Sequence, residues 1–183
     1  MYSDQYSDQE ELPESRYPRA PVERRIYAFL IDFVAVWLTS IIAGTGVIRW
    51  LIFILAWYGL RVFLVVNNQG QSLGRWAMDL KVIAPRFRKT PDMITLTKRE
   101  GILGFCALLA MIGLNINLRN GFSMLLLVSP LLADCGVAFA DEDFSQAFHD
   151  RITETLMIPS NRGFSLDLRA RKLLAQLKRN MRR

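Results

Sequence analysis

The sequence predicts an all-α membrane protein, a four-helix transmembrane bundle of two outward-pointing hairpins with interfacial amphipathic helices and a disordered N-terminal arm. Two observations predict this fold. First, the mean hydropathy is positive although 22% of the 183 residues are charged. Apolar and charged residues are therefore separated into blocks, whereas a soluble domain interleaves them. Second, four apolar stretches approach the roughly 20 residues that a membrane-spanning helix needs.

The first 23 residues are expected to form a disordered acidic arm in the cytoplasm. They contain a direct repeat, Tyr2–Gln5 and Tyr6–Gln9, and three prolines follow it. Such a segment has too little apolar area to offset the loss of chain entropy on folding. Its start lacks the basic and apolar regions of a signal peptide, so the first span is expected to act as the insertion signal.

A transmembrane domain is predicted over residues 24–158, with spans at about 26–48, 50–66, 101–118 and 122–140. Almost no chain separates the first two spans, and Gly44-Thr45-Gly46 allows the reversal, so they form a hairpin. Thr90-Pro91-Asp92 is a helix-start signal before the third span. Arg119-Asn120-Gly121 turns the chain before the fourth, which Pro130 is expected to bend.

The distribution of basic residues predicts the orientation of the chain. The two outer hairpins hold only Arg49 and Arg119, whereas the central loop and the C-terminal region are rich in Lys and Arg. Cytoplasmic loops carry the excess of positive charge, so both termini and the central loop are placed in the cytoplasm. The net charge of +6 then fits contact with anionic lipid and not with nucleic acid.

Two stretches have the pattern of interfacial helices. Ser72–Leu80 is short and amphipathic, with Trp76 at headgroup depth. The basic tail covers residues 159–183. Within it, the stretch from Leu166 to Arg183 places apolar residues on one helical face and Arg and Lys on the opposite face. A basic amphipathic helix binds an anionic membrane surface or docks on a partner helix. We expect surface binding, with a partner helix and a solvated tail as the alternatives.

Three charged residues within the spans form a predicted intramembrane charge layer: Asp32, Arg61 and Asp134. Each lies roughly 7–9 Å from the cytoplasmic end of its span at 1.5 Å per residue. A charge at mid-membrane costs about 2.5–3.5 kcal/mol, so each needs a partner or water. We expect Asp32 to pair with Arg61 across the first hairpin, with snorkelling of Arg61 to the interface as the alternative. Asp134 either joins this pair or faces water.

Four short motifs flank the spans and resemble the RDD family of bacterial membrane proteins. In order, they are Arg25-x-x-Ala28-x-x-x-Asp32, Gly70-Gln71-Ser72-Leu73-Gly74-Arg75, Arg99-Glu100 and Phe148-His149-Asp150-Arg151-Ile152-x-x-Thr155. The resemblance covers about residues 20–158. It identifies Arg25, Asp32 and Asp150 as the residues for which the family is named, with Gly70 and Gly74 as further motif residues. Ser72 and Arg75 depart from the commoner Thr and Lys.

The resemblance implies a helical protein of the bacterial inner membrane, and some relatives are implicated in cation/proton exchange. It also suggests that Arg25 and Asp150 pair at the cytoplasmic interface. From the residues themselves, we expect an interaction, assembly or accessory membrane subunit whose buried charges are structural. The alternative is a proton-coupled cation or small-solute transporter, which needs an oligomer because four spans enclose little volume. A membrane-protein partner or a second copy of the chain is expected in either case.

No motif in the sequence indicates an enzyme. Neither a Ser/His/Asp order, an HExxH pair, a phosphate loop nor a metal cluster is present, so we expect no catalytic residue, no metal and no cofactor. Cys106 and Cys135 lie in apolar segments without ligand spacing and are interpreted as small buried residues. His149, the single histidine, is interpreted as a capping or interfacial residue, with a proton relay as the alternative.

Overall fold

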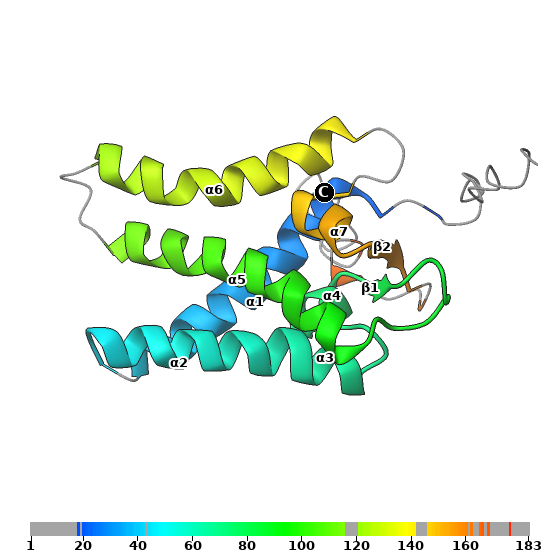
Figure 1. The fold of residues 1–183 in the computed structure, drawn as a ribbon, viewed down its shortest axis with the longest axis horizontal. Helices are drawn as coiled ribbons and strands as arrows, with labels where there is room; N and C mark the ends of the chain where they lie inside the picture. Colours follow the sequence, from blue (N-terminus) through cyan, green and yellow to red (C-terminus); the bar gives the residue numbers. More distant parts are fainter. Residues whose placement is uncertain are drawn as a thin grey trace, which may run out of the picture.

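A computed structural model of the chain describes residues 18, 20–42, 44–115, 121–141, 146–160, 162, 165, 166, 168 and 176. Four long helices lie alongside one another within this part of the chain: α1 (Val22–Ile42), α2 (Val47–Tyr58), α5 (Met93–Asn115) and α6 (Gly121–Ala140) (Figure 1). The shorter elements gather at one end of these helices, where α1 and α5 begin and α6 ends. We call this the polar end.

The first hairpin is present, and its turn is built on two glycines. Gly44 and Gly46 have φ values of +89° and +79°, a left-handed conformation that glycine adopts without a steric penalty. This turn follows Ile42 directly, so the first predicted span ends earlier than residue 48, and Val47 already begins the second helix. At its other end α1 begins before the predicted residue 26, directly after Pro21, whose carbonyl accepts the amides of Arg24 and Arg25.

The second helical segment is continuous but changes its winding. α2 runs into η1 (Gly59–Phe63), a turn of π-helix, and then into α3 (Leu64–Asn67). A π-turn inserts one extra residue into the α-helical pattern and redirects the side chains that it holds. Arg61 lies within this turn.

One apolar core cluster lies between α1, α2 and α5, and a second lies at the polar end around Val65 and Leu80. The side chains that form the first cluster are Phe33, Val36, Phe53, Trp57, Leu103, Ala107 and Met111. α6 packs along α5, and the crossing is close, because a Cβ atom added to Gly113 would lie 3.0 Å from the Cβ atom of Leu127. The outward faces of α1, α2 and α6 expose large apolar side chains such as Leu38, Leu55 and Leu125, as expected of helices that face lipid.

Three helical segments are long and apolar enough to cross a membrane: Val22–Ile42, Val47–Asn67 and Gly121–Ala140. They correspond to the first, second and fourth predicted spans. The third predicted span lies within α5, which starts earlier, at Met93, after an N-cap in which the Asp92 carboxylate accepts the Thr95 amide at 3.3 Å. The first turns of α5 carry Lys98, Arg99 and Glu100, which leaves its apolar part shorter than that of the other three segments. Whether α5 is a fourth membrane span therefore stays a prediction.

The prediction of an all-α fold is wrong at the polar end. β1 (Leu80–Ile83) pairs antiparallel with β2 (Leu156–Pro159), with Leu80 opposite Pro159 and Ile83 opposite Leu156. Each strand has only four residues, too few for an alternating pattern to be read. The two partners are also far apart in sequence, so nothing local indicates their pairing.

Two short helices complete the polar end, α4 (Leu73–Ala77) and α7 (Phe148–Ile152). The interfacial helix predicted over Ser72–Leu80 is therefore shorter, since Leu80 belongs to β1. Trp76 on α4 is half-exposed. Most of the predicted N-terminal arm and of the amphipathic tail helix lies outside the described residues.

Candidate functional site

Asp32 lies on α1 and is completely buried at the polar end. Its carboxylate accepts hydrogen bonds from Arg61 Nη1 at 3.0 Å, from the Ser72 hydroxyl at 2.6 Å and from the Gly74 amide at 2.7 Å. The predicted Asp32–Arg61 ion pair is thus present, and α4 supplies two further donors. A buried carboxylate needs such partners, because an unpaired charge is strongly disfavoured away from water.

Gly74 allows α4 to approach α1 closely enough for these bonds. A Cβ atom at this position would lie 1.9 Å from the carbonyl oxygen of Ala28, a distance that no side chain tolerates. Ser72 caps α4, and its hydroxyl accepts the Arg75 amide at 3.4 Å while it donates to Asp32. The motif Gly70–Arg75 therefore docks a short helix on the carboxylate of Asp32.

Gly70 has a separate role at the turn before α4. Its φ of +86° lies in the left-handed region, and a Cβ atom would lie 2.5 Å from the carbonyl oxygen of Val82. The Val82 amide donates to the Gly70 carbonyl at 3.0 Å. Only glycine fits both this conformation and the close approach of β1.

Arg61 turns into the protein and does not snorkel to the interface. Its Nε donates to Glu100 Oε2 at 2.7 Å, and its guanidinium lies 4.8 Å from the centre of the Trp57 ring. Trp57 in turn donates its indole N–H to the Glu100 carbonyl at 3.1 Å. A desolvated guanidinium over an aromatic face gains cation–π attraction. The π-turn therefore places Arg61 where it makes both an ion pair with Glu100 and a cation–π contact with Trp57.

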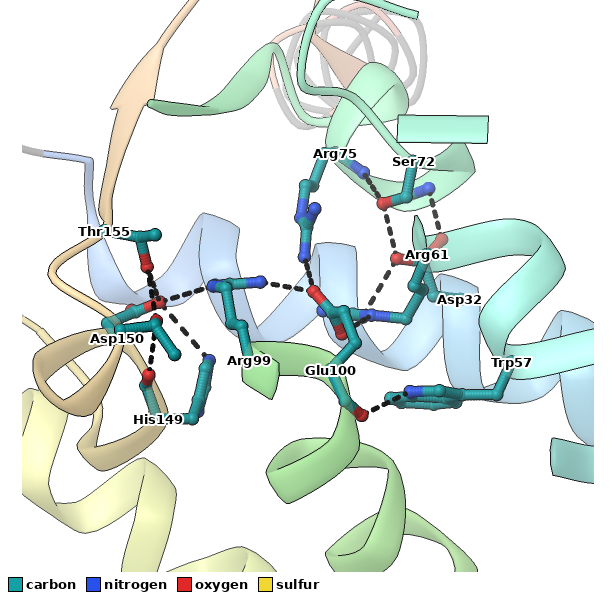
Figure 2. A network of polar contacts seen from close by, with 12 residues as sticks. Asp32, Trp57, Arg61, Ser72, Arg75, Arg99, Glu100, His149, Asp150 and Thr155 are labelled. Atoms are coloured by element: carbon teal, nitrogen blue, oxygen red, sulfur yellow. Dashed lines mark hydrogen bonds and ion pairs between the residues drawn. The ribbon is translucent and has the colours of Figure 1, made fainter. Parts of the chain in front are cut away.

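Glu100, at the polar end of α5, is the centre of the site (Figure 2). It is completely buried and accepts hydrogen bonds from three arginines: Arg61, Arg75 at 2.5 Å and Arg99. Burial lowers the pKa of Arg75 to about 10, so this guanidinium remains charged at neutral pH. One carboxylate therefore holds α5, η1 and α4 together.

Asp150 on α7 forms the second centre. Its carboxylate accepts from Arg99 Nε at 2.9 Å and Nη2 at 2.5 Å, and it also pairs with Arg25. The Arg25–Asp150 pair suggested by the resemblance is thus present. Burial alone would raise the pKa of Asp150, but Arg99, His149 and Arg25 outweigh that effect and hold the pKa well below its usual range.

Asp134 does not pair directly with Asp32 or Arg61. It accepts the backbone amide of His149 at 3.1 Å, contacts the His149 ring nitrogen Nδ1 at 2.7 Å and lines a small cavity. The reason is the packing of α6 on α5 and α7, which brings Asp134 to α7. The other ring nitrogen of His149 lies 3.4 Å from Asp150, so the imidazole bridges two carboxylates.

These contacts form one continuous network, which we call the charge network. Its members are Asp134, His149, Asp150, Arg25, Arg99, Glu100, Arg75, Arg61 and Asp32. They come from α1, η1, α4, α5, α6 and α7, so the network joins nearly every element of the polar end. Four arginines face four carboxylates, which leaves the charges balanced when His149 is neutral.

The contacts of the charge network are ion pairs and hydrogen bonds. The Ser72 hydroxyl donates to the carboxylate of Asp32, but it also caps α4 and is completely buried. Among the described residues, no group of three or more His, Cys, Asp or Glu side chains is placed to hold a metal ion. Both cysteines are free.

The central roles of Glu100 and Arg75 were not expected from the sequence. Both lie outside the predicted spans, so an argument based on charges within the membrane did not include them. The sequence did indicate that these residues matter, because Arg99-Glu100 and Arg75 belong to the short motifs that flank the spans. Their spacing, however, gives no indication that one carboxylate receives three arginines.

Comparison with known proteins places these observations in a family. The chain matches the RDD family over residues 19–154, a range that includes every member of the charge network. No curated protein and no solved structure matches the chain. The match covers most of the chain, and three helical segments are apolar and long enough to cross a membrane. The chain therefore belongs to the RDD family of membrane proteins.

Proposed function

We propose that this chain is an assembly or accessory subunit of the bacterial inner membrane, with the polar end in the cytoplasm. In this proposal the charge network is structural. It fastens α4, α7 and the two strands to the inner ends of the membrane helices and so presents a fixed cytoplasmic surface to a partner membrane protein or a second copy. The chain is not an enzyme in this proposal.

The observation that carries the proposal is the saturation of the buried carboxylates. Asp32 has three hydrogen-bond donors, and Glu100 has three arginines. An ionisable group inside a membrane protein is by default a candidate for ion or proton handling. Here, however, neither carboxylate has an oxygen left without a partner, and neither lines the cavity beside Asp134 and His149. This favours a structural role for both.

The proposed topology rests on charge and packing. Basic residues are concentrated in the segment between α3 and α5, which includes Arg75, Lys81 and Arg86, and the positive-inside bias assigns that side to the cytoplasm. The apolar half of α5 packs in the core between α1 and α2. If those two helices cross the membrane, α5 is carried across with them, which supports a fourth span.

Proton-coupled transport is the second candidate, and one feature favours it. Asp134, His149 and Asp150 form a chain of titratable groups, and Asp134 and His149 line a cavity. Histidine between two carboxylates is suited to passing a proton. A transport pathway through this site would pass along α6 and not through Asp32.

Two measurements separate these functions. Purified protein reconstituted in liposomes is tested for dissipation of a pH gradient, with Asp134→Asn as the variant and Glu154→Gln, on the protein surface, as the matched control. Protein extracted from its native membrane in mild detergent is analysed by native mass spectrometry. We expect that the reconstituted protein does not dissipate the pH gradient. We also expect native mass spectrometry to show the chain in a complex of defined mass with a partner or a second copy. Dissipation that disappears in Asp134→Asn but persists in Glu154→Gln would overturn the assembly proposal.

A further inference from the structure

A small cavity lies inside the charge network. Its volume is about 50 Å³, and all four arginines of the network line it. This is enough for several water molecules, since one water needs roughly 10–15 Å³ on this scale, and therefore enough for one compact polar group. Most of its wall is apolar, and the four guanidinium groups contribute hydrogen-bond donors to the smaller polar part.

Arg75 has donors that no described protein group accepts. Its Nη2 binds Glu100, whereas its Nε and Nη1 are buried and have no hydrogen-bond partner among the described residues. The side chain of Arg75 is 1% exposed. A buried donor without a partner costs about 1–3 kcal/mol. Arg75 therefore has donor capacity that the described carboxylates of the network do not use.

The remaining wall of the cavity is apolar and lies between two membrane helices. Val22 and Ile26 of α1 face Cys135 and Ala138 of α6 across it. Three of these side chains are half-buried and only Ala138 is fully buried, so the cavity is only partly enclosed. A ligand that enters here meets apolar surface first and guanidinium groups behind it.

We propose that this cavity binds the phosphate group of an anionic phospholipid, with its acyl chains lying outside along α1 and α6. Guanidinium groups bind phosphate oxygens through paired, charge-assisted hydrogen bonds. The phosphate oxygens take the free donors of Arg75. The position agrees with this, because Arg25 and His149 place the cavity at the polar end, where lipid headgroups lie beside the helix ends.

An anion fits the site better than a cation. Asp134 also lines the cavity, and each of its oxygens contacts His149. Among the described residues that line the cavity, the buried side-chain atoms without a hydrogen-bond partner are Nε and Nη1 of Arg75, and both are donors. A bound lipid is compatible with a structural or a transporting charge network.

Lipid binding is measured on the full chain in detergent micelles by native mass spectrometry, with titration of phosphatidylglycerol, phosphatidylcholine or inorganic phosphate. Ala138→Leu fills the cavity without altering a charge, and Ala133→Leu, on the exposed face of α6, is its matched control. Arg75→Gln removes the free donors. We expect one phosphatidylglycerol per chain, bound about tenfold or more weakly in Ala138→Leu and Arg75→Gln and unchanged in Ala133→Leu.

Three results would overturn the proposal. Equal binding of phosphatidylglycerol and phosphatidylcholine would mean that the site does not recognise an anionic headgroup. Inorganic phosphate that binds as tightly as the lipid would make this a free-anion site. Unchanged lipid binding in Ala138→Leu would place the lipid elsewhere, and this variant keeps the test valid if Arg75→Gln does not fold.

Discussion

Glu100 gives the sharpest test of the charge network, because its replacement by Gln keeps the shape and removes the charge. In the structure Glu100 faces three arginines. Unit charges about 4 Å apart attract by roughly 4 kcal/mol at an effective dielectric constant of about 20. The neutral side chain leaves these guanidiniums without their common counter-charge. We therefore expect Glu100→Gln to lower the free energy of unfolding.

The expected loss is smaller than the sum of three attractions. Gln is easier to bury than a carboxylate, so part of the lost attraction is offset by a lower desolvation cost. Removal of one partner from a buried ion pair destabilises proteins by about 3–5 kcal/mol, and we expect a loss in this range. The measurement is reversible unfolding in mixed micelles, followed by tryptophan fluorescence or circular dichroism.

The matched control is Glu154→Gln. Glu154 pairs with Arg86 at 3.3 Å, but the two side chains are 63% and 67% exposed, and such pairs contribute at most about 1 kcal/mol. The difference between the two variants isolates the effect of burial. If Glu100→Gln is within about 0.5 kcal/mol of the unchanged protein, or no less stable than Glu154→Gln, then the network does not hold the polar end together.

Three further predictions concern the helices that the network joins. Gly74→Ala should destabilise by about 3 kcal/mol in the same unfolding assay, the upper end of the usual cost of overpacking, since its Cβ atom would overlap the Ala28 carbonyl. A double-mutant cycle of Asp32→Asn and Arg61→Gln should show a coupling energy of about 0.5–3 kcal/mol, measured by unfolding of the four proteins. The free energy of unfolding should fall as the pH drops below about 4, the ordinary carboxyl pKa, less steeply in Asp150→Asn.

The pH prediction follows from the lowered pKa of Asp150. As the pH falls below the ordinary carboxyl pKa, the unfolded chain binds the proton first, so stability is lost as the pH approaches the folded-state pKa. A pH profile that is identical in Asp150→Asn would contradict this reasoning. For the double-mutant cycle, simple additivity would refute the Asp32–Arg61 pairing.

The control for Gly74→Ala is Gly136→Ala on α6, where an added Cβ atom meets nothing within 4 Å. This variant should leave stability unchanged or raise it slightly, because alanine is the better helix former. Equal effects at the two positions would mean that the close approach of α4 to α1 is not what requires glycine at Gly74.

Local sequence patterns were sufficient for the membrane helices. Hydropathy and turn glycines are properties of neighbouring residues, so they predicted the first hairpin and the span that became α6, with errors of a few residues at the ends. The Asp32–Arg61 pair was also predictable, because the two residues lie at similar depth on helices joined by a short turn. Both features depend on contacts between segments that are adjacent in the chain.

The sequence by itself therefore determined the separation of apolar and charged blocks, three helices fit to cross a membrane, and the need of Asp32 for a partner. Only the tertiary structure decided the partners of Asp134 and Glu100 and the pairing of the two strands. Asp134 meets His149 and not Arg61, Glu100 receives three arginines, and β1 finds β2. Each of these depends on which elements distant in sequence come together, and electrostatic complementarity alone does not choose among four arginines and four carboxylates.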